Sequence, residues 1–276
     1  MAFIDLHVHS TYSDGALTPT GLVDLAKETG LGAIALTDHD TTAGLEEALR
    51  HGEKRGVGVI PGIEISSWHG AMPLHILGYC FRHDDPVFQG KLLKIQEGRR
   101  IRNIRIIENL SRLGIEVTVN ELKRYSEYGQ TGRPHIARML VDKGVVRTVD
   151  QAFAKYLKRG AAAYAERFKL GAGEAIGLIR GAGGITVLAH PACLDPTLAI
   201  IPSLLEKLQK LGLGGVEVYY PTHSKKSVQV LTRIAEDLGL MMTGGTDFHG
   251  NSRSEVPLGG ARGFRVPGHL LEAMRK

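Results

Sequence analysis

The chain repeats one pattern, in which a short apolar run ends in residues with metal-binding side chains. In the first copy, Asp5-Leu6-His7-Val8-His9, the two histidines stand two positions apart, and on an extended strand such residues point to the same side. The pattern recurs where Ala33 to Leu36 leads into Asp38-His39, Val57 to Ile63 into Glu64, Ile185 to Leu188 into His190, and Met241 to Gly245 into Asp247-Phe248-His249. It predicts strands whose C-terminal ends converge on a polynuclear metal site.

Strand and helix patterns alternate in both the first and the last third of the chain. Strands are expected at 3–9, 33–37, 57–65, 74–81, 185–189, 215–219 and 240–244, and helices at 19–30, 42–55, 174–180, 202–211 and 224–238. Thr18 and Thr42 are the expected N-caps of the first two helices. The tail, 263–276, is expected to hold one short strand and a helix that begins after Pro267. About seven strand–helix units predict a TIM-like α/β barrel with its catalytic residues at the C-terminal strand ends.

The alternation is interrupted between residues 85 and 169, where the pattern is helical. A long amphipathic helix is expected over 86–113 and a short helix over 134–143. Thr118-x-x-Glu121 and Thr148-x-x-Gln151 have the form of capping boxes, which mark helix starts. We therefore expect two units: a metal-binding barrel made of 1–84 and 170–276, and a mainly helical insertion domain, 85–169, that contributes to the substrate pocket.

Charge is distributed unevenly along the chain. Residues 91–170 contain 18 Lys and Arg against 8 Asp and Glu, whereas the remainder contains 16 against 21. A positively charged module beside a metal site suits a phosphate-bearing ligand. For any single Lys or Arg, a solvated surface position without a role is the alternative.

Several protein classes are disfavoured. No stretch approaches the roughly 20 apolar residues that span a membrane, and the N-terminus enters a strand at Phe3 without the features of a signal peptide. Cys80 and Cys193 lie outside any Cys-x-x-Cys motif, which favours reduced thiols in a cytoplasmic protein over a disulfide. The glycines of the segment 56–62 miss the dinucleotide-binding spacing. No membrane association and no protein partner is implied.

Nine residues are the candidate metal ligands: His7, His9, Asp14, His39, Glu64, His75, His190, Asp247 and His249. Each alone has another explanation, since a histidine at a strand end is more often a hydrogen-bonded loop residue, Asp14 fits a turn and His75 fits a core position. Their joint occurrence favours a metal site. Imidazole and carboxylate ligands without thiolate fit a hydrolytic centre of divalent ions, with Mn²⁺ favoured and Fe²⁺ or Zn²⁺ as alternatives. A carboxylate such as Glu64 bridges two ions about 3.5–4 Å apart in hydrolytic sites.

The motifs His7-x-His9, Thr37-Asp38-His39, Gly62-Ile63-Glu64, Ala189-His190-Pro191 and Thr246-Asp247-Phe248-His249 resemble those of the PHP (polymerase and histidinol phosphatase) family. The resemblance covers nearly all of the chain outside the insertion, in the same order. It implies a distorted (β/α)7 barrel with a two- or three-metal site. It also implies three ligand sets: His7, His9, Glu64 and Asp247; then Glu64, His75 and His190; then Asp14, His39 and His249.

The insertion is similar to that of the branch that includes 3′,5′-nucleoside bisphosphate phosphatases, some of which also remove nucleotides from the 5′ ends of short RNA. The similarity lies in 131–137 (TGRPHIA) and 155–164. Arg133 precedes an expected helix start, so its guanidinium and the helix N-terminus can face one phosphate; an ion pair is the alternative role for Arg133, and packing the alternative for His135. The candidate phosphate-binding residues are Arg133, His135, Lys158, Arg159, His223, Lys225 and Lys226.

The expected activity is therefore metal-dependent hydrolysis of the 3′-phosphate of a 3′,5′-nucleoside bisphosphate, with 5′–3′ trimming of short RNA as an extension. Arg133 and the lysines would anchor the distal 5′-phosphate and so orient the reacting group. His223, His249 and a metal-bound water are the alternatives for the group that protonates the leaving hydroxyl. The rival functions are a histidinol-phosphate phosphatase, another amidohydrolase-like hydrolase and a metal-stabilised domain without catalysis.

Overall fold

A computed structural model describes residues 3–126, 130–166, 168–250, 256–261 and 264–275. Seven strands form one sheet in chain order: β1 (Ile4–Val8), β2 (Ala33–Leu36), β3 (Gly58–His69), β4 (Met72–Tyr79), β5 (Ile185–Leu188), β6 (Gly215–Tyr219) and β7 (Met241–Gly244). All neighbouring strands run parallel except at β4, which is antiparallel to both β3 and β5. The two-residue connection between β3 and β4 explains this, because such a short link permits only a hairpin.

The α/β fold and the seven strands are confirmed, but a closed barrel is not. Within the described residues, an isolated bridge near the site, between Val8 and Phe248, joins β1 to the segment that follows β7. The expected position of His75 at a C-terminal strand end is wrong, since it lies in the N-terminal half of β4, opposite Ser66. Because β4 is reversed, that half lies at the same edge as the C-terminal ends of the parallel strands.

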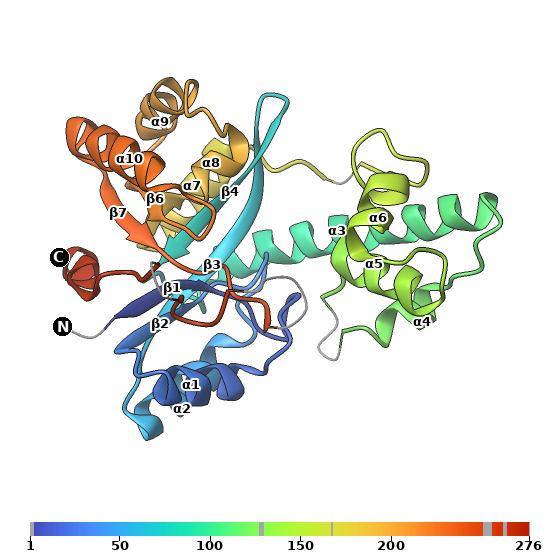
Figure 1. Cartoon of the computed structure of the whole chain (residues 1–276), viewed down its shortest axis with the longest axis horizontal. Coiled ribbons are helices and arrows are strands. Elements are labelled where there is room, and N and C mark those ends of the chain that lie inside the picture. The colour runs from blue at the N-terminus through green and yellow to red at the C-terminus, as the bar shows by residue number, and fades with distance from the viewer. Residues whose placement is uncertain (1–2, 127–129, 167, 251–255, 262–263, 276) are drawn as a thin grey trace.

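Helices cover both sides of the sheet in Figure 1. They are α1 (Pro19–Glu28), α2 (Leu45–Arg55), α7 (Ala172–Gly181), α8 (Pro191–Leu194), α9 (Ile201–Lys210) and α10 (Lys225–Leu238), followed by the 3₁₀-helix η3 (Gly268–Arg275). Thr18 caps α1 as expected, but the N-cap of α2 is Gly44 and not Thr42. The expected strand of the tail is reduced to a bridge between Val266 and Ile4.

The segment between β4 and α7 is helical, and in Figure 1 its later helices lie to one side of the sheet along α3. It contains α3 (Pro86–Arg112), α4 (Val119–Lys123), α5 (Arg133–Asp142), α6 (Val149–Ala152) and the π-helix η1 (Phe153–Leu157). The Thr118–Glu121 capping box is present, whereas the Gln151 side chain accepts from Arg147 N–H and not from Thr148 N–H. Buried residues of this segment form an apolar cluster of their own. The division of the chain into two domains stays a prediction.

One apolar cluster lies on the inner face of the sheet, and another lies on its outer face. The inner cluster joins Leu6, Tyr79 and Val187 to η3, while the outer cluster packs alternate strand residues against the flanking helices. Leu6 belongs to the inner cluster but Val8, two positions on, belongs to the outer one, because the β1–β2 register shifts between Asp5 and Val8. Such an irregularity re-aims the side chains that follow it.

No helix in the described ranges is both long enough and apolar enough to cross a membrane. Cys80 and Cys193 are free thiols.

Candidate metal centre

Glu64 lies at the centre of the candidate site. It comes from the middle of β3, and only 1% of its surface is exposed. Five imidazole nitrogens lie within 3.3 Å of its two oxygens: Nε2 of His7, Nε2 of His9 and Nδ1 of His39 around Oε2, and Nδ1 of His75 and Nε2 of His190 around Oε1. One carboxylate is therefore shared by five histidines from four parts of the sheet, since His7 and His9 both come from the end of β1.

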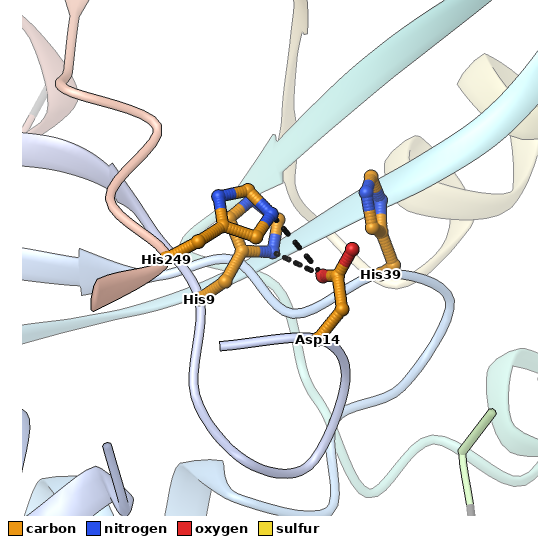
Figure 2. A group of neighbouring side chains, drawn as sticks. All are labelled: His9, Asp14, His39 and His249. Carbon is orange, nitrogen blue, oxygen red and sulfur yellow. Dashed lines mark ion pairs between the residues drawn. The ribbon is translucent and has the colours of Figure 1, made fainter. Parts of the chain in front are cut away.

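Two further carboxylates complete the cluster. Asp247 Oδ1 lies 3.3 Å from His7 Nε2 and 3.0 Å from His9 Nε2. Asp14 lies on the other side of His9, and its Oδ1 is 3.2 Å from His249 Nε2 and 3.9 Å from His9 Nδ1 (Figure 2). The two carboxylates thus flank a run of stacked imidazoles, since the rings of His9 and His249 are 4.2 Å apart.

All nine predicted ligands are brought together. Three groups have ligand atoms within 4.8 Å of one another: His7, His9, Glu64 and Asp247; His9, Asp14, His39 and His249; and His39, Glu64 and His75. The first group equals the first expected set. The second group is the expected set of Asp14, His39 and His249 with His9 added. The third group contains Glu64 and His75 of the expected set together with His39, while His190, the remaining member of that set, lies 3.1 Å from the Glu64 carboxylate. The assignment of each residue to an ion stays a prediction.

The backbone is strained at two of these positions. His190 has a φ of 32° and Asp247 a φ of 52°; residues other than glycine rarely adopt such positive values. Such conformations persist where the surrounding structure imposes them, and they cluster at functional sites. Gly245 shows how close the packing is, since a Cβ there would lie 2.3 Å from His7 Cβ.

Sequence reasoning missed the residues that support the ligands. Glu217, fully buried on β6, accepts hydrogen bonds from His7 Nδ1 (3.0 Å) and from the backbone N–H of His190 (2.7 Å). Tyr220 donates from its hydroxyl to Asp247 Oδ2 at 3.0 Å. An acidic residue inside the apolar run 215–219 was the available signal for Glu217, because a buried carboxylate requires partners.

Asp38 also has a supporting position, although it belongs to the motif that contains His39. Its carboxylate accepts from the N–H and hydroxyl of Ser10 (2.8 and 2.6 Å) and from the hydroxyl of Ser13 (2.6 Å). These bonds fix the loop that carries Asp14.

Burial and charge compete in setting the proton affinities of the cluster. Burial lowers the pKa of His7, but the neighbouring carboxylates, led by Glu217, outweigh it and hold that pKa well above its usual value. Burial raises the pKa of Glu64, but the imidazoles around it, led by His75, hold it well below its usual range. Burial lowers the pKa of His39 to about 4. Without metal, protons on imidazoles balance the carboxylates; divalent ions bind the deprotonated ligands and so displace these protons.

The donor set fits metal ions. Several buried ligand atoms of the cluster, among them Nε2 of His7, Nε2 of His9, Nδ1 of His39 and Oε2 of Glu64, face one another at ion-pair distance without a hydrogen bond of ordinary geometry among the described residues. Buried polar atoms without such a bond are uncommon in proteins. Each of these atoms is of a type that coordinates divalent cations.

A cavity of about 220 Å³ extends from the cluster to the helical segment. Asp14, His39 and His75 line its inner end, and its other walls carry four arginines: Arg99, Arg102, Arg133 and Arg159. Among the predicted phosphate-binding residues, Arg133, His135 and Arg159 line this cavity. Lys158, His223, Lys225 and Lys226 are not among its described lining residues.

Two of the predicted phosphate-binding residues, Arg133 and His223, already have contacts within the protein. Arg133 donates from Nη1 to the carbonyl of Leu157 at 3.3 Å, and its guanidinium lies 5.9 Å from the Phe153 ring centre. His223 is 8% exposed and donates from Nδ1 to the carbonyl of Val218 at 2.8 Å. Burial lowers the pKa of His223.

Comparison with known proteins decides the family. A family model of the PHP domain matches residues 5–158. The chain belongs to the PHP domain family. Among PHP relatives, a 3′,5′-nucleoside bisphosphate phosphatase of Chromobacterium violaceum is 37% identical over 250 residues, which cover 90% of this chain and 88% of the relative. A 5′-3′ exoribonuclease of Haemophilus influenzae is 36% identical, with 89% of each chain covered.

Solved structures share the PHP fold over nearly the full length. A Bifidobacterium adolescentis protein described as a metal-dependent phosphoesterase superposes with a TM-score of 0.88 at 30% identity, covering 98% of this chain and 94% of that one. An amidohydrolase from Chromobacterium violaceum with bound sulfate gives the same TM-score at 35% identity, with 99% and 97% covered.

Proposed function

We propose that this protein is a metal-dependent phosphoesterase that removes the 3′-phosphate from 3′,5′-nucleoside bisphosphates. The observation that supports this proposal is one cavity that reaches the candidate metal cluster at Asp14, His39 and His75 and carries four arginines along its other walls. A substrate with two phosphates matches both ends. The similarity to a 3′,5′-nucleoside bisphosphate phosphatase supports the same substrate class.

The nine clustered ligands would hold two or three divalent ions, with Mn²⁺ proposed and Fe²⁺ or Zn²⁺ as alternatives. When bound, such ions lower the pKa of water and offset charge on a phosphoryl oxygen. Glu64 would be shared between ions because its two oxygens face different histidines. Glu217 and Asp38 would hold the ligands in position through their hydrogen bonds.

The helical segment would supply the distal phosphate site, as expected of an insertion domain. Arg133 and Arg159 line the cavity, and α5 begins at Arg133, so the positive end of the helix faces the same space. Holding the 5′-phosphate there would place the 3′-phosphate at the metals, which converts remote binding energy into orientation.

His135 would contribute a neutral hydrogen-bond donor. Its Nδ1 accepts from the backbone N–H of Gly132 at 3.0 Å, so the proton of the neutral ring lies on Nε2. Burial lowers its pKa to about 4, which keeps the ring neutral near pH 7. A donor N–H at the cavity wall, close to Asp14, suits a phosphoryl or ribose oxygen.

A substrate panel with the Mn²⁺-loaded protein tests the proposal. We expect phosphate release from adenosine 3′,5′-bisphosphate and little from histidinol phosphate. Arg133→Ala should lower kcat/KM on the bisphosphate by about 10- to 150-fold, as expected for a lost charged hydrogen bond, and change hydrolysis of a small aryl phosphate far less. Arg147→Ala is the matched control, because Arg147 is exposed on the same segment and outside the cavity.

Two results would overturn the proposal in different ways. A preference for histidinol phosphate would contradict the substrate. Equal losses on both substrates in Arg133→Ala would assign Arg133 to the support of the fold rather than to the distal phosphate.

A second candidate function is 5′–3′ trimming of short RNA, favoured by the similarity to exoribonucleases. The chemistry is closely related, because the terminal nucleotide of a 5′-phosphorylated RNA has a 3′-phosphodiester where the bisphosphate has a 3′-monoester, beside the same 5′-phosphate. Release of nucleoside 5′-monophosphates from a 5′-phosphorylated trinucleotide, but not from its 5′-hydroxyl form, would support this activity. No release from either form would exclude it.

A further inference from the structure

The hairpin of β3 and β4 carries a line of side chains away from the metal cluster. Residues two apart on a strand share a face, so Glu64, Ser66 and Trp68 point to one side of β3. Opposite them on β4, Pro73 pairs with Trp68 and His75 with Ser66. At about 3.3 Å per residue, Trp68 stands roughly 13 Å along the strand from Glu64. The hairpin thus presents a metal ligand, a small residue and then an aromatic ring.

Trp68 contacts Leu170 and Lys169 and also lines the cavity. Its backbone N–H donates to the carbonyl of Leu170 at 2.9 Å, and the ammonium of Lys169 lies 4.9 Å from its ring centre. Trp68 lines the cavity, together with Phe153 and Tyr164, whereas Lys169 is not among the described lining residues. The cation therefore covers a part of the indole that the cavity does not reach.

The indole also carries a donor that the protein does not use. Its buried Nε1–H has no hydrogen-bond partner among the described residues. Tryptophan N–H groups usually find a partner when buried. A ligand oxygen or nitrogen that reaches the edge of the indole at this wall of the cavity would supply one, beside any contact with the indole face.

We infer that Trp68 is the surface on which the nucleobase of the substrate stacks. This inference rests on the proposed function and deepens it: the ligand is a nucleotide, with the ribose between the metal-held phosphate and the indole. Stacking on an aromatic face is tolerant of base identity because every base has a π-face. The cavity therefore selects for the presence of a base, and weakly for which base. Sugar phosphates without a base lose this contact.

The fluorescence of the protein reports this contact directly, since Trp68 is the only tryptophan in the chain. The Mn²⁺-loaded protein is titrated with adenosine 5′-monophosphate, the product, and with ribose 5-phosphate. We expect the emission to be quenched in a saturable manner by the nucleotide and to stay unchanged with the sugar phosphate. Equal effects of the two ligands, or no effect of the nucleotide at concentrations that inhibit turnover, would overturn the inference.

Variants separate stacking from support of the hairpin. Trp68→Leu should lower kcat/KM for adenosine 3′,5′-bisphosphate by about 5- to 150-fold, while the abasic analogue 1-deoxyribose 3,5-bisphosphate changes less than about twofold. Trp68→Phe should retain most of the activity because it keeps a ring. Phe168→Leu is the matched control, as Phe168 is 47% exposed and outside the cavity lining.

The outcomes distinguish this inference from the function on which it rests. If no bisphosphate is hydrolysed, the proposed function fails. If adenosine bisphosphate and the abasic analogue are hydrolysed equally well, or Trp68→Leu loses both activities equally, the function stands and the role of Trp68 is wrong.

Discussion

Replacing Glu217 with glutamine should weaken the support of two candidate metal ligands, His7 and His190. The Glu217 carboxylate accepts from His7 Nδ1 at 3.0 Å and from His190 N–H at 2.7 Å, and it is fully buried. Both partners are donors. A carboxylate offers acceptors on both oxygens, whereas glutamine has one acceptor oxygen and a donor NH₂ group of nearly the same shape. One of the two contacts in Glu217→Gln therefore becomes donor against donor.

The expected magnitude follows from that mismatch. A buried donor left without its acceptor costs about 1–3 kcal/mol of folding free energy. For the metal, the loss of a carboxylate that orients a ligating histidine typically lowers affinity or activity by about 10- to 100-fold. Because Glu217 contacts both His7 and His190, which face opposite oxygens of Glu64, we expect more than one ion to be weakened.

Competitive metal titration of the apo protein against a chromophoric chelator measures this effect, and urea unfolding measures the folding cost. Glu206→Gln is the control, since Glu206 is exposed on α9. Metal affinities of Glu217→Gln within twofold of those of the unmodified protein would refute the reasoning. So would a large stability loss with unchanged metal affinity, which would make Glu217 a purely structural group.

Three further perturbations have distinct expected outcomes. Glu64→Gln should lower the metal content found by elemental analysis by at least two ions per chain, whereas Asp14→Asn should lose at most one, because Glu64 alone contacts five imidazoles. Gly245→Ala should destabilise the protein by about 1–3 kcal/mol or more in urea unfolding, since its Cβ would lie 2.3 Å from His7 Cβ. Gly177→Ala, in open space within α7, should instead stabilise the protein by about 0.5–1 kcal/mol. The buried neutral ring of His135, with its pKa lowered to about 4, contributes stability that is present above pH 6.5 and lost as the pH falls toward 4. His135→Gln should therefore remove up to about 3 kcal/mol of the pH dependence of unfolding in that window, and an unchanged slope would contradict the assignment.

The strand-end residues could be found from the sequence because two local signals coincide there. An apolar run of four or five residues predicts a buried strand. A polar residue shortly after such a strand is expected at the sheet edge, where its side chain is available to bind a ligand. His190 and Asp247 follow this rule, and the strands before them have the predicted positions. Sequence periodicity also placed α3 and α10 within a few residues of their observed limits.

Residues whose role depends on distant contacts escaped prediction. Glu217 supports histidines that lie 210 and 27 positions away, so nothing in its neighbourhood reveals its partners. The orientation of β4 escaped for a similar reason, because alternation of apolar residues is the same for both strand directions. Trp68 lies beyond the end of the strand expected at 57–65, and it received no role from the sequence; the longer β3 and the hairpin place it at the cavity.

One ion pair ties the two parts of the proposed site together, and sequence patterns gave no sign of it. Arg99 of α3 donates from Nε to Asp40 Oδ2 at 2.6 Å and from Nη2 to the hydroxyl of Ser66 at 3.1 Å. Asp40, fully buried with a φ of 55°, follows His39 and also accepts from the N–H of Ser66. The long helix that leads to the distal phosphate site is therefore anchored one residue from a candidate metal ligand and beside the hairpin that carries Trp68. In the proposed function, this anchoring would set the distance between the candidate metal cluster and the arginines of the cavity wall, which is the distance that a substrate with two phosphates has to span.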